Sequence, residues 1–297
     1  MKTQKNSLSK GIIFSITTMA FLGLSACSNA EKAAPKTQEI GTVTLDTIIN
    51  DDRRLASDVA RDTYRNPKKT LEFFGVQPNM TIIEIWPSSY YMDIIPYYIA
   101  SQLNEEGVVK GHYVAAQLPL GISERLDKRI SDQQLQFESD KYKHISFTTF
   151  SKKSLSLETE NADMVLSFRN VHNWMSGAYA EEAFNSFYKA LKPGGILGIV
   201  EHRLPESVGQ DPLAANGYVQ TSYIKSLAKQ AGFEFVESSD INANPKDTAD
   251  HPFGVWALPP RSRTSHDKTS TPIGFDPSKY LAIGESDRAS LKFRKPF

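Results

Sequence analysis

The sequence predicts an α/β fold: a doubly wound, mostly parallel sheet with helices on both faces. Segments with strand-like and helix-like patterns alternate along the chain from about residue 76. Several of the strand segments, such as "MVLSF" and "ILGIV", are nearly all apolar. Such runs are typical of parallel strands that helices cover on both faces. Regular alternation of strand and helix therefore favours a doubly wound sheet over a sandwich or a helical bundle.

The individual elements follow from the periodicity of the apolar residues. Runs of β-branched and aliphatic residues, bounded by turn residues, predict six strands, and amphipathic patterns between them predict four helices. The predicted strands cover residues 80–86, 108–115, 144–150, 162–168, 195–202 and 233–238. The predicted helices cover residues 91–103, 122–134, 178–191 and 218–231.

The chain begins with a pattern that is typical of export. Residues 1–10 carry three lysines and no acid, and the apolar run that follows is too short to span a membrane. The run stops in "LSAC", which resembles a bacterial lipobox and implies cleavage before Cys27 and lipidation of its sulfur. We expect a signal peptide over 1–26, a lipidated flexible tether over 27–44, and a lipoprotein exported to the periplasmic face of the outer membrane.

The remaining chain is long enough for one domain with a sizeable core. Hydrophobic residues make up 40% of the sequence, and Cys27 is the only cysteine, so packing rather than an internal disulfide must stabilise the fold. Lysine plus arginine and aspartate plus glutamate balance at 34 each, which gives no electrostatic basis for binding nucleic acid. We expect N-terminal helices over 45–75, the α/β core over 76–241, and a long loop with a final strand over 242–297.

Side chains suited to chemistry follow two of the predicted strands. Arg169, Asn170 and His172 come directly after one strand, and Glu201 and His202 end the next. Ligands of open α/β sheets bind at the carboxyl ends of the strands. Arginine can bind a carboxylate, and histidine can transfer protons near neutral pH. The sequence therefore predicts a ligand-binding rim at this edge of the sheet.

Several segments resemble class I S-adenosylmethionine-dependent methyltransferases. "LKPGGILGIVEH" resembles the turn and fifth strand of that fold, "TIIEI" its first motif, and "ADMVLSFRNVHNW" its fourth strand with the segment after it. Longer pieces, among them "FFGVQPNMTIIEIWP" and "IGESDRASLKF", resemble an uncharacterised bacterial family of predicted methyltransferases over about residues 45–297. The resemblance implies a seven-stranded sheet whose last strand, "ASLKFRKP", is antiparallel. It also implies S-adenosylmethionine as cofactor and an unknown small molecule as methyl acceptor.

The resemblance assigns roles to residues of the cofactor half. Glu84 would be the acid of the first motif, which supports the loop or the methionine end of the cofactor. Gln117 falls where an acid normally binds the ribose hydroxyls, and Asn170 would border the cofactor. The turn beneath the cofactor would consist of Pro87, Ser88, Ser89 and Tyr90.

The same resemblance places the catalytic residues in the ligand-binding rim. His172 or Glu201 would act as general base toward the acceptor, and Arg169, Asn170 and His172 would border the position of methyl transfer. His202 is a further catalytic candidate of this rim. Catalysis would consist mostly of positioning, because the sulfonium of the cofactor already activates the methyl group.

A second hypothesis rests on what the turn after the first strand lacks. Its sequence, "WPSSYY", has no glycine, whereas such loops use glycine for positive φ angles and for close approach to the ligand. Gln117 offers the ribose no charge, and the predicted export separates the chain from a cytosolic cofactor. These features favour a catalytically degenerate methyltransferase-fold lipoprotein that serves as a binding or scaffold module in the cell envelope.

A third hypothesis is a metal-dependent or other hydrolytic site. Its ligands would be His172, Glu201 and His202, with Asp250 and His251 as further candidates. Their spacing matches no short metal motif such as His-Glu-x-x-His, so the sequence favours this hypothesis least.

Overall fold

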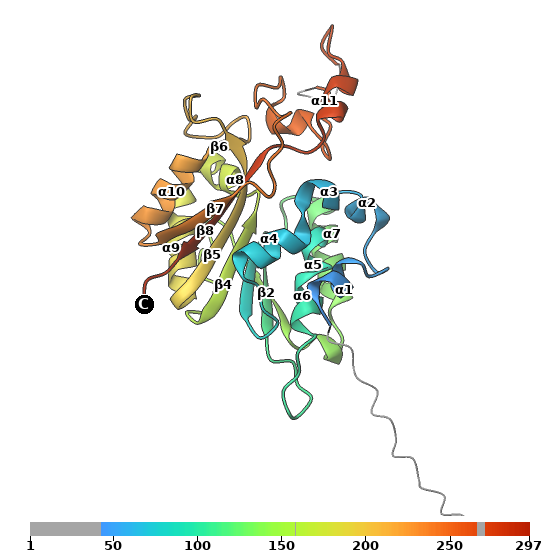
Figure 1. Ribbon diagram of the computed structural model, residues 1–297, viewed down its shortest axis with the longest axis vertical. Helices are drawn as coiled ribbons and strands as arrows, with labels where there is room; N and C mark the ends of the chain where they lie inside the picture. Colours follow the sequence, from blue (N-terminus) through green and yellow to red (C-terminus); the bar gives the residue numbers. More distant parts are fainter. Residues whose placement is uncertain (1–42, 158, 266–270) are drawn as a thin grey trace, which may run out of the picture. The chain divides into compact units, whose positions relative to one another are not determined.

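A single twisted sheet organises the part of the chain that the computed structural model describes, residues 43–157, 159–265 and 271–297 (Figure 1). The strand order is β3-β2-β1-β4-β5-β8-β7. Strands β1 to β5 pair in parallel, and β8 lies antiparallel between β5 and β7. The predicted doubly wound sheet with an antiparallel last strand is therefore confirmed. Cys27, the signal peptide and nearly all of the tether lie outside the described residues.

The strands start and end close to where the apolar runs place them. An extra two-residue strand, β6, pairs with the end of β5 and was not predicted. The strands are β1 Thr81–Ile85, β2 His112–Gln117, β3 Ile145–Thr149, β4 Ala162–Phe168, β5 Leu191–Leu204, β6 Val219–Gln220, β7 Glu234–Ser239 and β8 Arg288–Arg294.

Helices cover both faces of the sheet (Figure 1). Four short helices precede β1, as expected for the N-terminal segment. The α-helices are α1 Leu45–Ile49, α2 Ala56–Val59, α3 Asp62–Arg65, α4 Pro67–Phe74, α5 Ser89–Met92, α6 Ile95–Ile99, α7 Glu124–Gln136, α8 Val171–Ser176, α9 Ala180–Ala190, α10 Thr221–Gln230 and α11 Pro277–Ile283. The 3₁₀ helices are η1 Asp140–Tyr142 and η2 Gly254–Ala257.

The two-residue period of the strands divides the core between the two faces. Ile83 and Ile85 of β1 belong to one cluster of buried side chains, together with Phe184 of α9. Ile82, which points the other way, belongs to a second cluster with Phe74 of α4. All five side chains are 0% or 1% exposed. Burial on both faces explains why the sequence of β1 shows no polar alternation.

Several predicted boundaries were wrong, among them the start of β5, which was predicted at residue 195 and lies at Leu191. The helix predicted over 91–103 is two helices. α5 ends at Met92, and Pro96 lies in the first turn of α6, where its missing N–H costs nothing. The strand predicted from 108 starts at His112, since the preceding residues form a turn. The helix predicted from 218 starts at Thr221, because the two residues before it pair with β5.

The long C-terminal segment is more ordered than the loop that the sequence predicts. It contains η2 and α11 before the chain enters β8. Within the described residues, no helix has the length and apolar character needed to cross a membrane.

Candidate functional site

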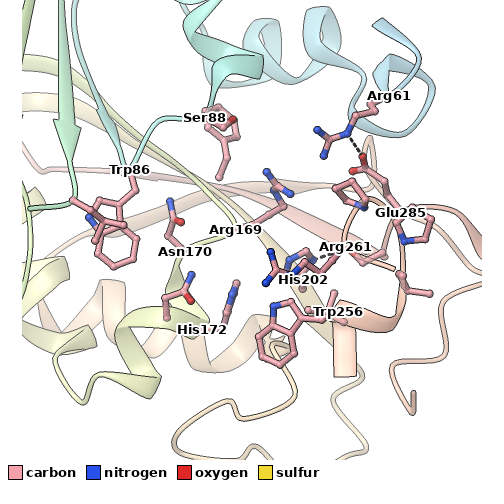
Figure 2. Close-up of a pocket in the computed structure, with 18 of the residues that line it drawn as sticks. Arg61, Trp86, Ser88, Arg169, Asn170, His172, His202, Trp256, Arg261 and Glu285 are labelled. Carbon is pink, nitrogen blue, oxygen red and sulfur yellow. Dashed lines mark hydrogen bonds and ion pairs between the residues drawn. The ribbon is translucent and has the colours of Figure 1, made fainter. Parts of the chain in front are cut away.

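A cavity of about 680 Å³ lies at the carboxyl ends of β1, β4 and β5. This is the edge of the sheet where the sequence predicts a ligand-binding rim, and the volume lies in the usual range for small-molecule sites. Glu84 lines the cavity. So do Ser88, Arg169, Asn170, His172 and His202 (Figure 2). The predicted rim residues of β4 and β5 are thus brought together with the end of β1. Residues of η2 and of the segment that follows it also line the cavity, and Trp256 lies beside His172.

Two wall residues hold a backbone conformation that favours glycine. Trp86, directly after β1, has φ +51°, and Arg169, directly after β4, has φ +65°. Left-handed angles at bulky residues cost on the order of 1–3 kcal/mol and persist where the surrounding structure enforces them. The Trp86 amide donates to Ala116, and the Arg169 amide donates to Val200, so each turn is pinned to the neighbouring strand. The turn after β1 therefore keeps its left-handed start without a glycine.

A buried carboxylate orients His172. Glu201 is 0% exposed, and its Oε1 accepts a hydrogen bond from His172 Nδ1 at 3.0 Å. Its Oε2 accepts from the amide of Val171 at 2.6 Å, at the N-terminus of α8. Because a carboxylate can only accept, the Nδ1 of His172 carries the proton and its Nε2 is free to accept one. Glu201 and His172 form a carboxylate–imidazole pair of the kind used for proton transfer.

His202 lies beside this pair and has a different hydrogen-bond partner. Its ring centroid is 5.4 Å from that of His172, and its Nδ1 shares a 2.6 Å hydrogen bond with the hydroxyl of Ser286. Burial, with the charges of His172 and Arg169 as smaller causes, holds the pKa of His202 well below its usual value. His202 is therefore a neutral imidazole on the cavity wall near neutral pH.

Glu84 forms the floor at the end of β1. Its side chain is 1% exposed, and its Oε2 accepts a hydrogen bond from the hydroxyl of Tyr113 at 2.7 Å. Burial raises the pKa of Glu84 to about 8, against the lowering effect of Tyr113 and Arg169. A cationic ligand group beside Glu84 would favour the ionised carboxylate.

Four of the residues predicted to bind the cofactor are not on the cavity wall: Pro87, Ser89, Tyr90 and Gln117. The hydroxyl of Tyr90 donates to Asp62 of α3 at 2.5 Å, which turns the ring under the N-terminal helices. Both ends of the buried Gln117 amide bond to α7, through Gln133 at 3.1 Å and Gln134 at 3.0 Å. Gln117 therefore fixes α7 on the sheet.

Trp86 supplies the aromatic wall that the sequence did not lead us to expect. Its indole Nε1 donates to the carbonyl of Phe150 at 2.8 Å, and its ring packs edge-on against Trp174. The exposed part of the indole lines the cavity (Figure 2). A flat ring at this place can stack with a planar ligand group.

Arginines are the second unexpected feature of the site. Arg61, Arg125, Arg129 and Arg261 line the cavity together with Arg169. Arg61 is paired with Glu285 at 2.6 Å, as Figure 2 shows. These residues lie before β1, on α7 and after η2, far from every strand end that the sequence analysis inspected. No local signal predicts them, because only the tertiary fold brings them to one cavity.

The possible metal ligands divide into two groups. His172, Glu201 and His202 offer ligand atoms within 4.8 Å of one another. However, both oxygens of Glu201 already accept hydrogen bonds from backbone amides, and the surrounding wall carries arginines. His251 bonds instead to Asp247 at 2.7 Å and does not line the cavity, and the side chain of Asp250 is 80% exposed. The five-residue metal set is therefore not assembled.

The cavity fits S-adenosylmethionine in part. Its size is sufficient, Glu84 stands where the amino group of the methionine end would need an acid, and Trp86 offers a surface for adenine stacking. Ser88 and Asn170 also line the cavity. Gln117 does not line the cavity, so it would not bind the ribose hydroxyls. The residues that would hold the cofactor are thus Glu84, Trp86, Ser88 and Asn170.

Comparisons with known proteins agree with this fold. Residues 100–199, about a third of the chain, match the model of a family described as "Methyltransferase domain". A "putative sarcosine dimethylglycine methyltransferase" from Galdieria sulphuraria superimposes with a TM-score of 0.51 at 14% identity, covering 82% of this chain and 88% of that one. A S-adenosylmethionine-dependent methyltransferase from Aquifex aeolicus gives a TM-score of 0.47 at 14% identity, with 62% and 87% covered.

A third solved structure is phosphoethanolamine N-methyltransferase 2 of Haemonchus contortus, in complex with S-adenosylmethionine. It gives a TM-score of 0.49 at 15% identity, covering 86% of this chain and 61% of that one. No match was found among curated proteins. At these identities the structural likeness concerns the fold. The chain has the class I methyltransferase fold, and a methyltransferase-domain match covers its central third.

Proposed function

We propose that this protein is an S-adenosylmethionine-dependent methyltransferase that acts on a small acceptor. The observation that carries the proposal is the cavity at the carboxyl ends of β1 and β4, where Glu84 and the Glu201–His172 pair face one space. The fold and the methyltransferase-domain match support the same assignment.

Each group of cavity residues has its own role in the proposed reaction. His172, held by Glu201, accepts a proton from the acceptor through its Nε2. The neutral His202 and the half-buried Arg169 orient the acceptor beside it. Glu84 and Trp86 hold the cofactor on the side of β1. When bound, S-adenosylmethionine supplies an activated methyl group on its sulfonium, so positioning is the main task of the protein.

A transfer assay tests the proposal. The protein is incubated with methyl-labelled S-adenosylmethionine and a small-molecule extract, and labelled products are separated by chromatography. We expect a labelled product that disappears in His172→Ala and persists in the control His112→Ala. His112 lies on β2, bonds to Ser146 at 2.9 Å and does not line the cavity. A product that forms equally with His172→Ala would refute the role of the pair.

A second candidate function is a non-catalytic binding module with the same fold. It is favoured by the serines that stand where the resemblance places loop glycines, and by the attachment of Gln117 to α7. Under this alternative the cavity binds a ligand but neither S-adenosylmethionine nor its demethylated product. Binding of either compound therefore separates the two functions.

The cellular location is part of the proposal. We infer from the lipobox-like "LSAC" that the chain is exported and anchored by lipid on Cys27, with the outer membrane as destination. Acyl chains contribute about 0.8 kcal/mol per buried CH₂, so several chains together hold a protein at the membrane. Growth with labelled palmitate should label the protein, and Cys27→Ser should abolish the label. An unlabelled wild-type protein would contradict this anchor.

A further inference from the structure

We propose that Arg125, Arg129 and Arg261 form a subsite for an anionic group at the mouth of the cavity. The ligand group is a phosphate or a carboxylate. If the protein is the proposed methyltransferase, the subsite implies a methyl acceptor that carries an anionic group. This identification of the acceptor rests on the proposed function. Anion binding itself does not depend on it.

The three guanidinium groups come from two elements that face each other across the mouth. Arg125 and Arg129 are four residues apart on α7 and so lie on one face of that helix. Arg261 follows Pro259 and Pro260, which also line the cavity. Two smaller hollows adjoin the main one, and Arg125 and Arg261 line both of them. The arginines thus surround a connected space rather than point into separate solvent regions.

Unlike the arginines of the fold that form ion pairs, these three have no acid beside them. Arg54 pairs with Asp62 at 2.7 Å, and Arg203 pairs with Asp287 at 2.8 Å. In the described part of the chain, no carboxylate lies within ion-pair distance of any of the three subsite arginines. Their positive charge is therefore available to a ligand.

The arrangement also has an electrostatic cost that an anion would relieve. Like charges four residues apart on a helix repel each other. Partial desolvation of its guanidinium by the surrounding protein, together with the charge of Arg125, lowers the pKa of Arg129. A phosphate or carboxylate between the two side chains would accept paired N–H bonds from the planar guanidinium groups, which is the geometry these groups favour.

The rest of the cavity does little to offset this charge. Of the acids on its wall, Glu84 is largely protonated near neutral pH, because burial raises its pKa to about 8. Glu285 is surrounded by Arg61 at 2.6 Å, Arg65 at 3.0 Å and Arg288 at 3.0 Å. Arg169 adds a further positive charge deeper in the cavity. The wall as a whole favours an anion at its mouth.

Calorimetric titration of the full-length protein with pyrophosphate and with citrate tests the subsite. We expect binding of at least one of them, and a loss of about tenfold or more in affinity in the double variant Arg125→Gln/Arg129→Gln, since hydrogen bonds to charged groups contribute about 1.5–3 kcal/mol. Lys128→Gln is the matched control. It removes one positive charge from the same helix, but Lys128 pairs with Asp132 and does not line the cavity.

The outcomes separate this inference from the proposed function. Binding of neither anion, or equal binding by the double variant, would overturn the subsite even if S-adenosylmethionine binds. Anion binding without S-adenosylmethionine binding would leave the subsite and remove the methyltransferase. Both mutated side chains are exposed, so thermal unfolding of the double variant should match the wild type and show that it is folded.

A second arm identifies the source of the anion. Sedimentation with phosphatidylglycerol vesicles, compared with phosphatidylcholine vesicles, tests a lipid headgroup. Vesicle binding that pyrophosphate displaces, and that Arg125→Gln/Arg129→Gln abolishes, assigns the subsite to a headgroup. Pyrophosphate or citrate binding without vesicle binding assigns it to a soluble anion.

Discussion

At the residue scale, Trp86 and Glu84 show that the turn after β1 keeps its backbone conformation and its acid although it contains no glycine. The turn after β1 retains a left-handed start at φ +51° with a tryptophan, where the fold favours glycine. The indole then forms part of the cavity wall and bonds to Phe150. The acid two residues earlier stays at the end of the strand, buried beside Tyr113.

Glu84 should make the stability of the protein depend on pH. In the unfolded chain the carboxyl ionises at its ordinary pKa near 4.5, whereas burial raises the pKa to about 8 in the folded protein. Between these values the folded state holds one more proton than the unfolded state. The free energy of unfolding should therefore fall as pH rises through this window, by at most about 1.4 kcal/mol per pH unit.

Glu84→Gln isolates this effect. Urea unfolding of both proteins from about pH 5 to about pH 10 should show that the wild type loses stability relative to the variant as pH rises. The difference should level off above the folded-state pKa. A constant difference across the range would mean that the carboxylate is ionised in the folded protein.

The element scale is where the sequence predicts most. Long apolar runs such as residues 162–168 and 195–202 became β4 and β5, because strands buried on both faces need apolar residues throughout. The predicted boundaries were wrong where a few local contacts determine where an element begins or ends. Pro96 divides one predicted helix, and pairing with β5 converts the start of another into β6.

Gly198 tests the close packing of β5 between its neighbours. A Cβ at this position would lie 2.7 Å from Leu166 of β4 and 2.8 Å from Phe74 of α4. Gly198→Ala should therefore destabilise the protein by about 1–3 kcal/mol through overpacking. Gly209→Ala is the control, because a Cβ there has no atom within 4 Å. Equal free energies of unfolding for the two variants would show that β5 has more room than the structure indicates.

Tertiary contacts that join the two ends of the described domain complete the site at the scale of the whole molecule. Glu285, just before β8, accepts hydrogen bonds from Arg61 and Arg65 of the N-terminal helices and from Arg288. Glu285 and Arg61 both line the cavity. The pairs of Glu285 with Arg61 and Arg65 span more than 200 positions of sequence, so no local pattern predicts them. The strand ends of the site were predictable, and the walls supplied by distant segments were not.

Glu285→Gln should destabilise the whole domain. Arg65 and Arg288 are 3% and 2% exposed, and the substitution would leave both charges buried without their carboxylate. Removal of one partner from a buried ion pair typically costs about 3–5 kcal/mol. Chemical denaturation measures the loss. Glu237→Gln, which removes an exposed partner of Lys292, should change stability by less than about 1 kcal/mol. A loss for Glu285→Gln as small as that of the control would contradict the cluster.

The most direct measurement of the central claim is calorimetric titration of the full-length protein with S-adenosylhomocysteine, the demethylated product of the proposed cofactor. The product lacks the sulfonium charge, so its binding reports the shape of the cavity beside Trp86 and Glu84 with less influence from the arginines. We predict saturable heat at one site per chain, weakened when Trp86 is replaced by alanine. An absence of heat at millimolar ligand would contradict the methyltransferase assignment.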